Sequence, residues 1–134
     1  MREILFRGKR EYNGKWVVGS LLIWSDGSTE ICHTHPDNED ELLKVIVYPE
    51  TVGQFTGLTD KNGKKIFEGD IVQYYGTYAL EVFIENGHTK TRWFDTVTNS
   101  KCTELFFGYD AEAYGECEVI GNIHDNDLGD FNGN

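Results

Sequence analysis

Three Asn-Gly pairs constrain the fold of this chain more than any other feature of its sequence. Asn13-Gly14, Asn62-Gly63 and Asn86-Gly87 each lie between strand-like runs. A type I′ hairpin turn needs positive φ at both central positions, and asparagine and glycine adopt that conformation most easily. The three pairs therefore predict antiparallel hairpins, and Asp26-Gly27 predicts another tight turn.

The runs between these turns are short and rich in β-branched and aromatic residues, which favour strands. Strands are predicted for residues 3–7, 15–24, 28–32, 42–48, 64–67, 70–75, 78–85, 90–94 and 116–123, with one helical turn after Pro49. The first three should form a meander. Many short strands with regular turns predict an all-β or β-dominated fold with little helix. We expect short antiparallel strands in one strongly curved or barrel-like sheet arrangement.

The chain has 134 residues, a length that fits one compact domain. We predict a single domain over residues 1–124. One alternative divides it into an N-terminal meander (1–47) packed on a barrel-like part (48–124). Residues 125–134, rich in Asp, Asn and Gly, are predicted to be a flexible acidic tail. Residues 33–41 carry four carboxylates and are predicted to be a loop or an exposed insertion.

The charge balance is strongly acidic, with 23 Asp and Glu against 12 Lys and Arg and a formal net charge of −11. A protein that binds nucleic acid by neutralising phosphates needs a basic face, so direct nucleic-acid binding is not expected. The acidity favours a solvated surface that is attracted to basic partners. Mimicry of DNA is the alternative explanation of the same charge.

The compartment follows from the cysteines and from the absence of long apolar runs. Cys32, Cys102 and Cys117 form an odd set without a C-x-x-C pair, which suits free thiols in a reducing cytoplasm. The N-terminus has no apolar run of signal-peptide length, and no segment approaches the roughly 20 apolar residues that cross a bilayer. We therefore expect a cytoplasmic protein without membrane contact.

The most metal-like cluster is Cys32-His33-x-His35, which offers thiolate and imidazole ligands that His88 or His124 would complete. Its spacing matches no zinc motif, and histidines exposed in a loop explain the cluster equally well. Cys32, His33 and His35 are thus the only metal candidates that we name. Our prediction is that the protein has no metal site and no cofactor.

A second candidate is His124 with Asp125 and Asp127, because a carboxylate can orient an imidazole that acts as a general base. Adjacent strand residues point to opposite faces, however, and the segment fits a turn at the end of a strand. The sequence also contains no nucleophile elbow, phosphate loop or dinucleotide fingerprint. We predict no catalytic residues and no enzymatic activity.

Three ordered blocks of the sequence resemble a known family. They are residues 4–10 with 13–17, residues 48–72 (YPETVGQFTGLTDKNGKKIFEGDIV) and residues 118–126 (EVIGNIHDN). The chain is similar in these blocks to the YopX family of small phage and prophage proteins. That resemblance implies a mainly β fold in a bacterial host cell and no assigned activity or catalytic residues. Gly69 and Asp70 resemble the turn that precedes a strand in small SH3-like barrels, which implies a structural role.

Three functions remain open from the sequence. The favoured one is a non-enzymatic protein-binding module, which engages a host or phage protein and has a homo-oligomer as a further option. The alternative is an acidic DNA mimic that acts on a nucleic-acid enzyme. A metal-dependent enzyme ranks third. Because the three matched blocks have adequate structural explanations, we expect function to depend on the poorly matched segments 33–41 and 86–115.

Overall fold

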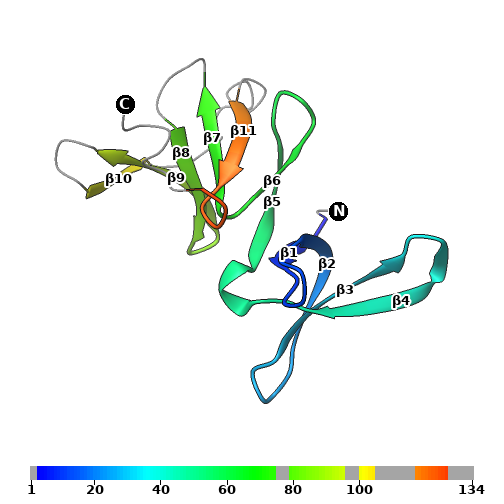
Figure 1. Cartoon of the computed structure of the whole chain (residues 1–134). Coiled ribbons are helices and arrows are strands. Elements are labelled where there is room, and N and C mark those ends of the chain that lie inside the picture. The colour runs from blue at the N-terminus through cyan, green and yellow to red at the C-terminus, as the bar shows by residue number, and fades with distance from the viewer. Residues whose placement is uncertain (1–2, 75–78, 96–99, 105–116, 127–134) are drawn as a thin grey trace. The chain divides into compact units, whose positions relative to one another are not determined.

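A computed structural model describes residues 3–74, 79–95, 100–104 and 117–126 (Figure 1). For residues 74, 93–95 and 100–104 the description concerns the backbone alone. The chain divides into two compact units, residues 1–55 and 56–134, and each is described by itself. Among the described residues, no helix is long and apolar enough to span a membrane.

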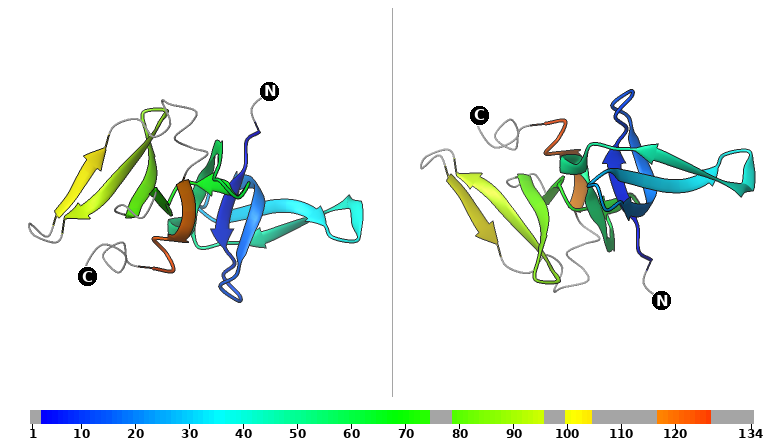
Figure 2. Two further views of the ribbon diagram at one scale, coloured as in Figure 1. Left: turned by 90° about the horizontal axis from the view of Figure 1, so that it is seen from above. Right: turned by 90° about the horizontal axis from the view of Figure 1, so that it is seen from below.

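The N-terminal unit is an antiparallel meander continued by the start of a fifth strand. It comprises β1 (Phe6–Lys9), β2 (Trp16–Ile23), β3 (Thr29–His35), β4 (Asn38–Ile46), the 3-10 turn η1 (Pro49–Thr51) and the beginning of β5 (Gly53–Thr59). The sheet has the order β4-β3-β2-β1-β5-β6, and β5 runs across the boundary between the units. Figures 1 and 2 show β3 and β4 as a long hairpin that protrudes from the rest of this unit.

Alternation along the strands builds the core of this unit. Val17, Ile31 and Val47 are buried and pack together, with Phe6, Leu21 and Val52 around them. Gly8 allows this packing, because a Cβ there would lie 3.0 Å from the Cβ of Val47. A side chain at position 8 would therefore force β1 away from the residue that follows β4.

The C-terminal unit contains the rest of β5, β6 (Lys65–Phe67), β7 (Asp70–Tyr74), β8 (Ala79–Glu85), β9 (His88–Asp95), β10 (Ser100–Glu104) and β11 (Cys117–Asn122). Its own antiparallel sheet has the order β10-β9-β8-β7-β11. Ile66, Val72, Val82 and Cys117 form the buried core, and Leu58, Leu80 and Val119 pack against it. The last strand thus closes the core that the middle of the sequence begins.

Two buried carboxylates shape the turns of this unit. Asp60 Oδ1 accepts hydrogen bonds from the backbone N–H groups of Asn62 and Lys64, both at 2.9 Å. Its Oδ2 accepts one from Val119 N–H at 2.9 Å, which ties the turn to β11. Asp70 Oδ2 likewise accepts a hydrogen bond from Phe67 N–H at 2.7 Å, across a turn in which Gly69 has φ of 94°.

The prediction of an all-β fold is confirmed, whereas the barrel-like arrangement is not, because neither sheet closes in the described part of the chain. Asn86 and Gly87 have φ of 52° and 78°, which confirms the type I′ turn predicted from this pair. At the other two pairs Gly14 and Gly63 have positive φ, at 71° and 80°, but the asparagines do not, so turns form there without the predicted type I′ geometry. The helical turn after Pro49 is confirmed as η1. The predicted tail falls largely on residues 127–134, outside the described residues.

The loop predicted for residues 33–41 is wrong in one respect. The segment is exposed, but β3 continues to His35 and β4 begins at Asn38, so that Pro36 and Asp37 alone form the turn. Pairing of Thr34 with Leu42 and of His35 with Asn38, with a register shift between the two pairs, carries the ladder to the tip. Its polar composition reflects solvent exposure of a protruding hairpin.

Replacement of Asp60 by Asn should destabilise the protein by about 1–3 kcal/mol, because Oδ2 is lost as the acceptor for the part-buried N–H of Val119. Burial acts to raise the pKa of Asp60, but the hydrogen bonds from Val119, Lys64 and Asn62 outweigh it and hold the pKa below its ordinary value. The stabilisation is therefore complete above the ordinary carboxyl pKa of about 3.9 and is lost as pH falls through the lower folded-state pKa.

Urea unfolding of the wild type and of Asp60→Asn from neutral to acidic pH measures this difference. The difference in free energy of unfolding between the wild type and Asp60→Asn should become smaller at acidic pH. The matched control is Asp26→Asn, since Asp26 also accepts hydrogen bonds from Ser28 in a turn but is exposed, so water can replace them. Equal effects of the two substitutions would contradict the role of Asp60.

The thiol of Cys117 should resist alkylation in the native protein. Burial raises its pKa to about 11, and the negative charge of Asp60 acts in the same direction. Cys32, which is half-buried, should react faster. Iodoacetamide labelling followed by peptide mass spectrometry, with and without denaturant, measures this, and rapid native labelling of Cys117 would show that the core is open.

Candidate protein-interaction surface

The structure separates the predicted metal candidates. Cys32 lies opposite Lys44 and His33 lies opposite Leu43 in the β3–β4 ladder, so the two neighbours point to opposite faces of the sheet. His35 Nδ1 accepts a hydrogen bond from Asp37 N–H at 3.0 Å. No group of three His, Cys, Asp or Glu side chains suited to a metal ion occurs within the described residues. His88 and His124 belong to the C-terminal unit.

The segment around His124 forms a turn organised by Asn122 at the end of β11. Asn122 Oδ1 accepts hydrogen bonds from the N–H groups of His124 and Asp125, both at 3.0 Å. Asn122 Nδ2 in turn donates to Asp125 Oδ2 at 2.9 Å. The carboxylate of Asp125 thus helps to close the turn, and Asp127 lies outside the described residues.

Exposed apolar side chains are concentrated in the N-terminal unit. Of the nine large hydrophobic residues found exposed in the described part of the chain, eight lie in residues 1–55 and one, Ile123, lies beyond. The eight are Ile4, Tyr12, Val18, Ile23, Trp24, Leu42, Ile46 and Tyr48. Single exposed hydrophobic residues are common, but a cluster on one surface indicates an interaction site.

Several of these residues share one face of the β3–β4 hairpin. Glu30 lies opposite Ile46, Cys32 opposite Lys44 and Thr34 opposite Leu42, and directly paired residues point to the same face. Trp24 joins this row, because its indole Nε1–H donates to Glu30 Oε1 and the Lys44 ammonium lies 5.8 Å from its ring centroid. We call the set Trp24, Glu30, Leu42, Lys44 and Ile46 the outer patch.

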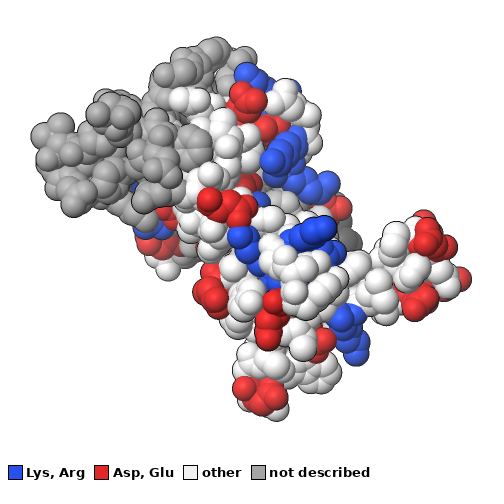
Figure 3. Space-filling view, in the orientation of Figure 1, with Lys and Arg blue, Asp and Glu red and all other residues white. Residues whose placement is uncertain are grey.

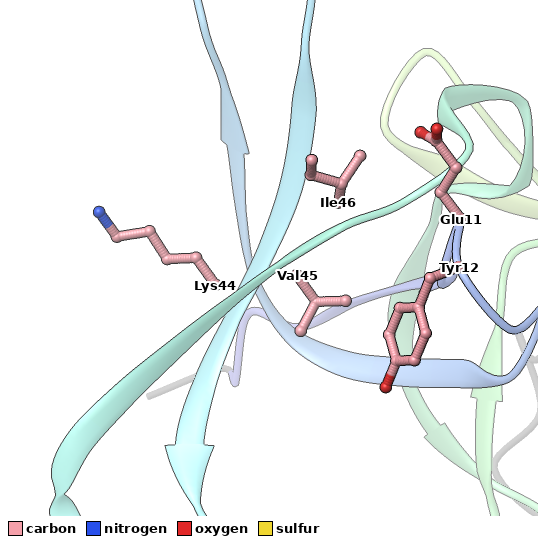
Figure 4. A pocket seen from close by; sticks show the side chains of 5 residues that line it. All are labelled: Glu11, Tyr12, Lys44, Val45 and Ile46. Carbon is pink, nitrogen blue, oxygen red and sulfur yellow. The ribbon is translucent and has the colours of Figure 1, made fainter.

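A pocket of about 380 Å³ lies beside β4, lined by Glu11, Tyr12, Lys44, Val45 and Ile46 (Figure 4). Its wall is fixed where the turn after β1 meets the end of β4. Glu11 N–H donates to Ile46 O at 3.0 Å, and the Tyr48 hydroxyl donates to Glu11 O at 3.2 Å. The ring of Tyr12, which is 78% exposed, offers a flat apolar surface at the mouth.

Acidic and basic side chains occupy different parts of the same hairpin. Its end carries the exposed carboxylates Asp37, Glu39, Asp40 and Glu41, whereas Lys44 lies closer to the body of the unit. Figure 3 shows acidic atoms at the end of the protruding hairpin and basic atoms nearer its base. The hairpin therefore presents an acidic tip, a basic side chain and apolar residues within one strand.

The outer patch and the pocket were not predicted from the sequence. The alternation of Leu42, Lys44 and Ile46 was the available signal, but the predicted strand was assigned no exposed face. We expected function to depend on segments 33–41 and 86–115. The acidic part of the first of these segments lies at the tip of this hairpin. Of residues 86–115, side chains are described only for 86–92. An open sheet surface with dispersed polar groups is suited to contact with a macromolecule.

Comparison with known proteins supports the fold and identifies the family. No curated protein matches the chain. The crystal structure of protein EF1440 from Enterococcus faecalis is similar, with a TM-score of 0.55 and 22% sequence identity over 94% of this chain and 96% of that chain. At this identity the likeness concerns the fold alone. The family model described as YopX protein matches residues 5–128, and the chain therefore belongs to the YopX family.

Proposed function

We propose that the chain is a non-enzymatic protein-binding module whose contact surface is the outer patch. The observation that carries this proposal is the concentration of exposed apolar residues in the N-terminal unit, with Trp24 and Ile46 on one face of the sheet. Aromatic and aliphatic anchors surrounded by charged groups are typical of interaction sites. Glu30 and Lys44 supply such charges here.

The partner that we propose is a host or phage protein in the bacterial cytoplasm. The resemblance to phage and prophage proteins supports the origin, and the cysteine usage supports the compartment. The patch suits a partner with an apolar surface and both signs of charge at its rim, because Glu30 and Lys44 flank Trp24. An acidic DNA mimic would need ordered rows of carboxylates, whereas Figure 3 shows acidic and basic atoms intermixed among the described residues on the face that it draws.

 The double substitution Trp24→Ser/Ile46→Ser should weaken partner binding and leave the fold intact, since both side chains are exposed, Trp24 at 48% and Ile46 at 53%, and neither belongs to the buried core. Truncation of two anchors should weaken binding by about tenfold or more. Affinity purification from a bacterial host lysate with quantitative mass spectrometry measures the recovery of a stoichiometric partner.

The matched control is Ile4→Ser/Ile123→Ser, which removes exposed apolar side chains that are not members of the outer patch. It should retain the partner that the wild type recovers. Recovery of that partner by both double variants would place the contact elsewhere. If the wild type recovers no stoichiometric partner, the proposed function fails.

A further inference from the structure

The three Asn-Gly turns differ in the hydrogen bonding of the glycine N–H. Gly14 N–H donates to Arg10 O at 2.8 Å. Gly63 N–H donates to Asp60 O at 3.0 Å. Gly87 N–H, in contrast, donates to no atom of the described residues. The nitrogen of Gly87 is therefore the one glycine nitrogen of these turns that no described carbonyl holds in place.

The asparagine residues of the three turns differ in the same sense. Asn13 Oδ1 accepts a hydrogen bond from Lys15 N–H at 2.9 Å, which fixes the side chain over its own turn. Asn62 lies in the turn that Asp60 organises, and its backbone N–H donates to Asp60 Oδ1 at 2.9 Å. The side-chain amide of Asn86 makes no hydrogen bond with a described residue. Access does not separate the three pairs, because all three asparagines are exposed and a Cβ built on any of the three glycines would meet no described atom within 4 Å.

We propose that Asn86 is a site of deamidation in the folded protein. The inference goes beyond the proposed function and does not require it. Hydroxide removes the proton of Gly87 N–H, and the nitrogen, which no Cβ shields, attacks the side-chain carbon Cγ of Asn86. A new C–N bond closes a succinimide ring, the bond from Cγ to the amide nitrogen breaks, and ammonia leaves with a proton from water. Hydrolysis by water then opens the ring and leaves a carboxylate, as aspartate or isoaspartate.

Hydrogen bonding of the glycine N–H opposes this reaction at the other two turns. The N–H must leave its carbonyl before the nitrogen loses its proton and approaches Cγ, so the turn has to open first. A typical backbone hydrogen bond shifts such an equilibrium by about tenfold. Because all three pairs have the same dipeptide sequence, this difference should decide which asparagine reacts in the folded protein.

The product changes the turn between β8 and β9. Glu85 pairs directly with His88, so the Asn-Gly pair alone forms the loop. Isoaspartate carries its side-chain carbon in the main chain, which lengthens a loop whose type I′ geometry fits two residues. Either product also adds a negative charge beside Glu85, whose carboxylate contacts Lys90 Nζ at 3.0 Å. Deamidation should therefore weaken the β8–β9 hairpin.

Incubation of the purified full chain at mildly alkaline pH in heavy-oxygen water tests the site. Only residues converted during the incubation take up the heavy oxygen, and mass spectrometry after digestion at acidic pH quantifies them at the three turns. In the folded protein Asn86 should be converted about tenfold faster than Asn13 or Asn62. In guanidinium chloride the three rates should become similar, because no turn persists. Conversion of Asn86 no faster than that of Asn13 or Asn62 in the folded protein overturns the inference.

Asn86→Gly is the matched variant, because glycine keeps the positive φ of the turn and has no amide to lose. Incubation under the same alkaline conditions should lower the midpoint of guanidinium unfolding of the wild type and leave that of Asn86→Gly unchanged. An equal result for the two proteins would contradict the effect on the hairpin. The partner test uses freshly purified protein with intact asparagines, so a failed partner test and a failed deamidation test are distinguishable.

Discussion

The C-terminal unit depends on the carboxylate of Asp60. Three backbone N–H groups converge on it, from Asn62 and Lys64 in its own turn and from Val119 in the last strand. A buried carboxylate costs free energy unless such bonds compensate it, so the turn and β11 stabilise the charge and each other. The backbone N–H of Lys61 adds a bond to Cys117 O at 2.9 Å. Residues 48–72, the block in which the resemblance to the family is most specific, therefore include Asp60 as a residue with a structural role.

The sequence predicted those features that depend on local geometry. Asn86-Gly87 specifies its turn through positive φ, and Pro49 begins a helical turn because its φ suits the first helical position. The contact between Asp60 and Val119 could not be predicted, since 59 residues separate its partners and neither has a distinctive local pattern. The end of the β3–β4 hairpin was missed because its strands are exposed, so no apolar alternation marks residues 33–41.

The two units differ in the surfaces that they offer. Residues 1–55 contain nine Asp and Glu against six Lys and Arg, whereas residues 56–134 contain fourteen against six. The acidity of the chain thus belongs mainly to the C-terminal unit. The N-terminal unit combines a near balance of charge with most of the exposed apolar residues in the described chain. Apolar contact with a charged rim gives both affinity and discrimination, which acidity alone does not.

The position of β4 in the sequence links these observations to function. It lies between the first and middle blocks of the family resemblance, and none of the three blocks contains Asp40, Leu42 or Lys44. Charged residues commonly protect a sheet edge from non-specific pairing. In β4 Asp40 and Lys44 stand four residues apart on the terminal strand of the sheet, so this edge carries both signs of charge. Because Asp60 and its neighbours stabilise the C-terminal unit, substitutions in β4 can alter the contacts of this strand without altering that scaffold.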